Sequence, residues 1–327
     1  MLNAPVGNVP ILPDDCDPPY HDKWRKVLNP PFSKGAVAKL DEYVCEKSAA
    51  LLDTFARNGE CEFVAEFAAK LPGIVLFERI FRVPIEDLPQ LFDDIDIYSF
   101  GPLEERVGAF ERVKTYIENF LRERQSADPQ GDIVDGIVAG VEKNGEICPW
   151  EDRVYAALDV VFGGLATTTH AVAAAIFHLA THPEVRRDIL ANPNLVDVAV
   201  AETVRLYAPV VAPARTVTKR VEIAGVQFEP GDRVALNFAA ASRDPEACRN
   251  PAEFDLHRTD MVHTAFGVGP HRCLGEHLAR LEIKVAIEEF LKRIPEFDLK
   301  PGTWPAHSSE QMRSMRDLHL VWHVQPR

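Results

Sequence analysis

The 327-residue sequence is poor in cysteine and lacks the paired spacings that hold zinc or a disulfide framework. No two cysteines form a C-x-x-C pair, and none is spaced from histidines as in a zinc finger. We therefore exclude both kinds of framework and expect a reducing, cytoplasmic compartment. The cysteines are Cys16, Cys45, Cys61, Cys148, Cys248 and Cys273.

The sequence also lacks an excess of positive charge and an uninterrupted apolar run. Its net charge is −14, which argues against a nucleic-acid partner. Residues 1–15 have neither a basic region nor a long apolar stretch, so we expect no signal peptide. The most apolar segment, residues 154–180, contains Asp159 and His170, which favours a long buried helix over a membrane span.

Helical periodicity dominates the first two thirds of the chain, and prolines at 30, 149, 183 and 209 mark starts and stops. Short strands are indicated within residues 214–238 and 318–324, with a long irregular loop at 241–262. The pattern predicts a mainly α fold with a minor β part, in a single domain covering residues 1–327. The predicted helices are 22–29, 36–57, 62–70, 85–97, 103–125, 132–143, 150–181, 184–190, 195–207 and 275–293.

One cysteine has an unusual setting, in "TAFGVGPHRCLG" at residues 264–275. Gly267 and Gly269 permit positive φ angles or close approach to a flat partner. Cys273 directly precedes a predicted helix, where backbone amides and the helix dipole favour a thiolate. From these residues alone, Cys273 is a nucleophile, a metal ligand or a buried structural cysteine.

The string "FGVGPHRCLG" resembles the haem-binding loop of cytochromes P450, with the pattern F-G-x-G-x-H-x-C-x-G. The resemblance implies that Cys273 is the iron ligand of haem b (iron protoporphyrin IX). It also implies that His271 binds a haem propionate, that Phe266 packs beside the ligand and that Gly275 closes the motif. Thiolate donation to iron favours O–O cleavage.

Glu202 and Arg205 lie three residues apart in "AVAETVRLYAP", on one face of a predicted helix. They resemble the structural Glu–Arg pair of the family. Family members often add an arginine from a P-x-R-F element, but here "PAEF" has Glu253 in that place. His257 and Arg258 are the candidate substitutes.

Further cations resemble the family's propionate-binding residues. His21 and Arg25 stand four apart in "DPPYHDKWRKVL", and Arg215 lies in "PARTVT". Charge-assisted hydrogen bonds from such donors would hold two carboxylates.

The family resemblance also implies an electron-donating partner, a ferredoxin-type protein. Lys23, Arg25, Lys26 and Arg272 are expected to form a basic patch on an otherwise acidic protein, which suits an acidic partner.

The segment "DVVFGGLATTTHA" resembles the family's oxygen-binding helix. Thr167 matches the alcohol that stabilises bound dioxygen, and Gly163 and Gly164 leave room for it. The family usually has Asp or Glu where this chain has Ala166. Three interpretations follow: ordered water relays protons with Thr167, the enzyme uses peroxide, or it is a haem-thiolate nitric oxide reductase.

The substrate pocket is expected to be lined by Asp159, Phe162, Val210, Val211 and Met312. An acid at position 159 would select a polar or basic substrate group. Residues 278–302 resemble the bacterial camphor-hydroxylase group, which hints at compact cyclic or terpenoid substrates.

We therefore expect a haem-thiolate monooxygenase that inserts one atom of O2 into a small hydrophobic substrate. The alternatives are a peroxygenase, a nitric oxide reductase or an inactive haem-binding fragment. Only 16 residues precede "DPPYH", so we also expect a cytochrome P450 fold that is truncated and lacks its N-terminal sheet and first helices.

Overall fold

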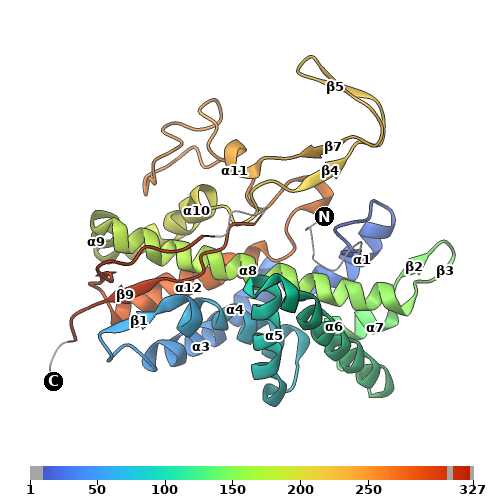
Figure 1. The fold of residues 1–327 in the computed structure, drawn as a ribbon, viewed down its shortest axis with the longest axis horizontal. Helices are drawn as coiled ribbons and strands as arrows, with labels where there is room; N and C mark the ends of the chain where they lie inside the picture. Colours follow the sequence, from blue (N-terminus) through green and yellow to red (C-terminus); the bar gives the residue numbers. More distant parts are fainter. Residues whose placement is uncertain (1–9, 308–311, 325–327) are drawn as a thin grey trace.

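A computed structural model describes residues 10–307 and 312–324 and is mainly helical (Figure 1). Short 3₁₀ turns join several helices, and two segments, η3 (Val64–Ala68) and η4 (Leu76–Phe81), are π-helical. The α-helices are α1 (Tyr20–Leu28), α2 (Lys34–Val37), α3 (Asp41–Asp53), α4 (Lys70–Val75), α5 (Leu88–Phe100), α6 (Leu103–Ser126), α7 (Ile133–Ala139), α8 (Trp150–Thr181), α9 (Pro183–Ala191), α10 (Val196–Leu206), α11 (Phe238–Ala241) and α12 (Glu276–Arg293).

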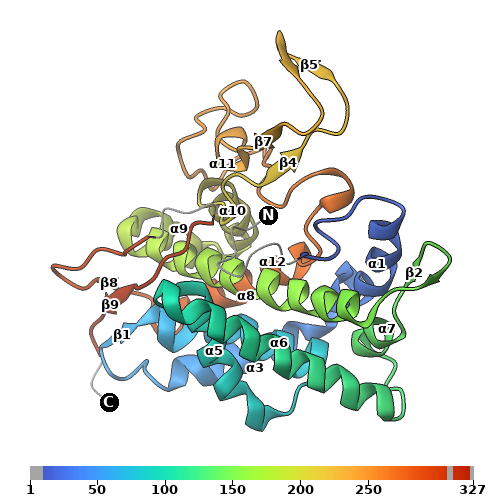
Figure 2. The ribbon, with the colours of Figure 1, turned by 45° about the vertical axis from the view of Figure 1, so that its right-hand side comes forward.

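Helix α8 is the central element of the fold, as the sequence predicts. It runs 32 residues between Pro149 and Pro183, two residues that delimit helices, and most of its side chains are buried. In both views it crosses the middle of the molecule, with α5 and α6 on one side and β4 and β7 on the other (Figures 1 and 2). It is long and apolar enough to cross a membrane, but 78% of its apolar window is buried inside the protein. It is therefore a core helix.

Several predicted helices differ from the observed ones in their extent. The helix expected at 36–57 is divided into α2, a 3₁₀ turn and α3. The helix expected at 62–70 continues as η3, α4 and η4 to Phe81, with Pro72 in the first turn of α4. The helix expected at 132–143 ends at Gly140, whose φ is 70°.

The β part consists of short antiparallel pairs, as expected for residues 214–238 and 318–324. A three-stranded sheet in the order β1-β9-β8 joins an early strand to the end of the described chain. The β5–β6 hairpin projects from the body of the molecule (Figures 1 and 2). The strands are β1 (Glu60–Glu62), β2 (Glu142–Lys143), β3 (Glu146–Ile147), β4 (Ala214–Thr216), β5 (Val221–Ile223), β6 (Val226–Phe228), β7 (Arg233–Ala235), β8 (Asp298–Leu299) and β9 (His319–Val321).

Candidate active site

A cavity of about 600 Å³ lies between α8, the loop before α12, strand β4 and residues 10–17. It is bounded by Cys273 and also by Thr167, although these residues are far apart in the sequence. The topology therefore brings the predicted cysteine loop and the predicted oxygen-binding helix to one space.

The cysteine loop has the backbone conformation that its glycines predict. Gly267 and Gly269 have φ angles of 70° and 72°, which favour glycine. The loop is closed by hydrogen bonds from Gly267 N to Thr264 O at 2.8 Å and from Cys273 N to Phe266 O at 2.8 Å. Phe266 and Cys273 consequently both line the cavity.

The electrostatic setting of Cys273 differs in part from the sequence prediction. A hydrogen bond from the Gly275 amide favours the thiolate, but burial outweighs it and raises the pKa of the thiol to about 11. The Gly275 amide therefore acts in the direction that the sequence predicts, and burial of the metal-free thiol opposes it. A metal cation would have to displace the proton, as it does when a thiol becomes a ligand.

Cationic side chains gather at one end of the cavity. Arg25 from α1, Arg215 from β4 and His271 from the cysteine loop all line it. Burial lowers the pKa of His271, and its Nδ1 atom has no hydrogen-bond partner among the described residues.

His21 does not join these cavity-lining residues. Its ring is buried and packs on the His271 ring, with 4.4 Å between centroids, while its Nδ1 lies 3.0 Å from Asp22 Oδ1. His21 is not among the described residues that line the cavity, but its buried Nε2 has no hydrogen-bond partner among them, so its contact with a propionate stays a prediction.

The middle of α8 provides the predicted glycines and threonine. An added Cβ at Gly163 would have no neighbour within 4 Å, so this position opens into the cavity. At Gly164 an added Cβ would touch Leu76 Cδ2 at 3.4 Å, which is ordinary contact. Thr167 donates a hydrogen bond from Oγ1 to Gly163 O at 2.7 Å. Ala166 is buried and is not one of the described residues that line the cavity.

Four of the five predicted pocket residues line the cavity. Val210 and Met312 do so as partners in an isolated antiparallel bridge. Val211 does not, and that prediction is wrong: consecutive residues of an extended segment face opposite sides, and Val211 packs against the hydrophobic core.

Asp159 and Phe162 complete the predicted pocket. Phe162 lies against Tyr98 and Phe110, with ring centroids 4.6 Å and 5.8 Å away. Burial is the main cause that raises the pKa of Asp159 well above its usual value, and the negative charges of Asp14 and Asp15 add to the effect.

Several lining residues carry no motif that sequence reasoning detects. Asp14 belongs to an irregular segment before α1, and Glu282 lies on α12 two turns beyond the cysteine loop. Glu282 is 2% exposed, and burial raises its pKa to about 8. Glu282 occupies an interior position of its helix, where charged residues are rare. A charged residue at such a position was therefore the signal in the sequence that could have identified it.

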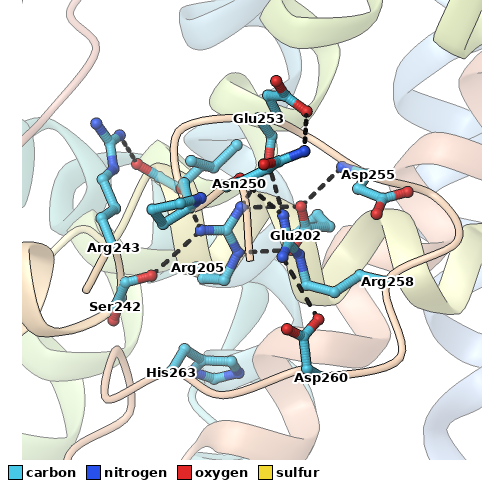
Figure 3. Close-up of polar contacts among 12 residues, drawn as sticks. Glu202, Arg205, Ser242, Arg243, Asn250, Glu253, Asp255, Arg258, Asp260 and His263 are labelled. Carbon is cyan, nitrogen blue, oxygen red and sulfur yellow. Dashed lines mark hydrogen bonds and ion pairs between the residues drawn. The ribbon is translucent and has the colours of Figure 1, made fainter. Parts of the chain in front are cut away.

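Beside the cavity, Glu202 and Arg205 form the predicted pair, fully buried on α10 (Figure 3). Arg205 Nε donates to Glu202 Oε1 at 2.6 Å, and its NH2 group donates to Oε2 at 2.9 Å. Arg258 is the third partner, since its Nε donates to Glu202 Oε1 at 2.9 Å. The backbone carbonyl of Glu253 accepts from Arg205 and Arg258, and its side chain accepts from Asn250 and does not contact Glu202. The network anchors the long loop at 241–262 to α10.

The predicted basic patch is only partly realised. Arg25 lines the cavity and so does not belong to a surface patch. Lys23 is paired with Glu142, and Arg272, which is exposed, forms an ion pair with Glu276 at 2.7 Å. Lys26 is exposed at the end of α1.

Comparisons with known proteins agree with this geometry. A family model described as "Cytochrome P450" matches residues 70–319. The chain is 31% identical to "Probable cytochrome P450 127A1" of Sinorhizobium fredii, over 96% of this chain and 75% of that protein. It is 29% identical to "Biotin biosynthesis cytochrome P450" of Bacillus subtilis, over 93% and 78%. Its structure is similar to the hydroxylase HmtN of himastatin biosynthesis, with a TM-score of 0.87, 27% identity and coverage of 94% and 81%. The chain belongs to the cytochrome P450 family and is a monooxygenase, an oxidoreductase.

Proposed function

We propose that this enzyme inserts one oxygen atom from O2 into a small, largely apolar substrate, compact and cyclic or terpenoid, with electrons from a ferredoxin-type protein in the cytoplasm. The observation that carries the proposal is the single cavity bounded by Cys273, Gly163 and Thr167. It combines a potential iron ligand with an alcohol and an open glycine position.

The residues of the cavity fit a haem b group. Cys273 supplies the thiolate ligand, and Arg25, Arg215 and His271 provide cations for the propionates. The unpartnered Nδ1 of His271 and the empty surroundings of Gly275 and Gly163 support this fit among the described residues. When bound, haem supplies the iron that activates oxygen, with thiolate donation favouring O–O cleavage.

The chain's own side chains prepare the site for this chemistry. The hydroxyl hydrogen of Thr167 is engaged in the hydrogen bond to Gly163 O, so its oxygen is left to accept a hydrogen bond from a group in the cavity. The apolar walls formed by Phe162 and Val210 exclude water and surround the substrate.

A peroxide-driven reaction is the second candidate function, and Ala166 is the observation that favours it. A methyl group at this position has no proton to donate to the cavity. Peroxide already contains both protons and both electrons that the O2-driven route must obtain.

A carbon-monoxide spectrum of the reduced, haem-loaded protein tests the ligand. We expect the red-shifted Soret band of thiolate ligation, its loss in Cys273→Ala, and its retention in the control Cys45→Ser, whose half-buried cysteine lies on α3. A wild-type spectrum without this band would overturn the proposal.

The oxygen source and electron donor are tested by turnover of a panel of compact cyclic hydrocarbons. We expect product with ferredoxin, its reductase and O2. Product with peroxide alone would favour the second candidate, and consumption of nitric oxide with NADH alone would favour a nitric oxide reductase.

The exposed Lys26 provides a docking test, because Lys26→Glu should raise the KM for an acidic ferredoxin and leave peroxide-driven turnover unchanged.

A further inference from the structure

An acidic side chain, Asp159, lines the cavity on the same helix as Phe162 and Thr167. Asp159 stands on α8 one turn before Phe162, which packs against Tyr98 and Phe110. Asp159 lines the cavity, and it has no hydrogen bond or ion pair with any residue that the structure describes. The ligand is therefore the available partner for this carboxyl group.

The groups that act on Asp159 make its anion unstable without such a partner. Asp14 and Asp15, from the segment before α1, repel it, and Arg25 of α1 attracts it. Burial together with the two like charges raises the pKa of Asp159. A positive charge brought into the cavity would relieve both the burial and the repulsion.

Two of the cavity's arginines would be engaged once haem is bound, a step that rests on the function proposed above. Arg25 and Arg215 would each meet a propionate, which adds two negative charges to the cavity. Arg233 also lines the cavity, so three arginines would face two propionates and the carboxyl groups of Asp14, Asp15 and Asp159, and the acids remain in excess. A neutral hydrocarbon would leave this imbalance unchanged, whereas a cation would reduce it.

We propose that the enzyme takes substrates in which a compact apolar body carries a protonated nitrogen, and that Asp159 binds this nitrogen. Phe162, one turn after Asp159, lines the same cavity as Tyr98 and Phe110, and Phe and Tyr rings attract positive charge. Asp159 is thus a specificity-determining residue, and the apolar walls hold the remainder of the molecule.

The test uses two probes of the same shape, cyclohexyltrimethylammonium and tert-butylcyclohexane, which differ in charge. Neither has a lone pair that could ligate iron. Equilibrium dialysis against the haem-loaded protein measures the affinity for each. We expect the wild type to prefer the cation at least tenfold. Asp159→Asn should weaken cation binding about tenfold, equivalent to about 1.4 kcal/mol, with little effect on the hydrocarbon.

Asp188→Asn is the matched control, because it removes the same charge from an exposed position on α9. It should change neither affinity. Asp159→Ser provides a second variant if the asparagine variant folds poorly, and circular dichroism checks both. Equal wild-type affinities, or an equal loss of both probes in Asp159→Asn, would overturn the assignment.

The carbon-monoxide spectrum of the same samples separates this inference from the proposed function. A thiolate-type spectrum without a preference for the cation would overturn the role of Asp159 alone. A wild-type sample without that spectrum would overturn both.

Discussion

Arg258 donates a hydrogen bond from Nε to Glu202 Oε1 at 2.9 Å, across 56 positions of sequence. Its remaining donors reach the backbone carbonyls of Arg249, Asn250 and Glu253. The Arg258 side chain therefore donates to a buried carboxylate and also binds the backbone of a turn in the loop at 241–262.

Replacement of this arginine tests its contribution to stability. Arg258→Ala leaves Glu202 buried with one cation fewer and removes the Arg258 donors from the carbonyls of Arg249, Asn250 and Glu253. We expect the free energy of unfolding to fall by about 3 kcal/mol, measured by urea titration and circular dichroism. The control Arg249→Ala, an exposed arginine 3.8 Å from Asp260, should cost less than about 1 kcal/mol. Equal losses in the two variants would contradict this role.

Two glycines should respond in opposite directions to alanine. Gly163 lies inside α8 with no described atom within 4 Å of an added Cβ, so Gly163→Ala should gain up to about 1 kcal/mol of helix stability. In Gly73→Ala the new methyl group would overlap the half-buried ring of Phe92, and the thermal midpoint should fall. Differential scanning calorimetry measures both, and a lower midpoint for Gly163→Ala would show that the cavity wall does not tolerate the methyl group.

The buried Glu282 should make the free energy of unfolding fall as pH rises. Burial raises its pKa in the folded protein to about 8, above the 4.5 typical of an unfolded chain. The folded state therefore binds more protons between these values, and the stabilising effect of the neutral acid is lost as pH rises through about 8. Between pH 5 and pH 8, we expect Glu282→Gln to lose less unfolding free energy than the wild type, by a few kcal/mol at most. Parallel pH profiles would show that Glu282 is not buried as an acid.

The buried His170 should make the free energy of unfolding fall as pH decreases, which is opposite to the effect of Glu282. Its Nδ1 accepts a hydrogen bond from Met315 N at 3.1 Å, and its Nε2 lies 3.0 Å from Tyr207 O. Burial lowers its pKa to about 4, so the unfolded state binds more protons below pH 6.5 and stability falls as pH decreases. The loss between pH 7 and pH 5 should be about 2 kcal/mol smaller in His170→Gln. The exposed His257→Gln is the control and should reproduce the wild-type profile.

The features that the sequence predicts correctly depend on neighbouring residues. The glycines of the cysteine loop, the extent of α8 and the Glu202–Arg205 pair all follow from local spacing. For the third partner of Glu202, the sequence leaves two candidates, His257 and Arg258. It cannot choose between them because the path of an irregular loop depends on the contacts that its side chains make.

Other features depend on elements that meet only in the fold. His21 has the expected spacing from Arg25, but it packs on the His271 ring and is not among the described residues that line the cavity. Gly275 supplies the amide predicted beside Cys273, yet burial outweighs it and keeps the pKa of the thiol high. Local spacing determines which face of a helix or strand a residue occupies. Its burial depends on elements from distant parts of the sequence that pack against that face.

The length of the core helix α8 has a consequence for selectivity. Asp159 and Thr167 lie eight residues apart on α8, which corresponds to about 12 Å along the axis. With the charged group of a substrate bound to Asp159, the helix fixes the distance from that group to Thr167. The position oxidised on a substrate would then follow from the length of its carbon skeleton, and a shorter or longer homologue would be oxidised at a different carbon counted from the nitrogen.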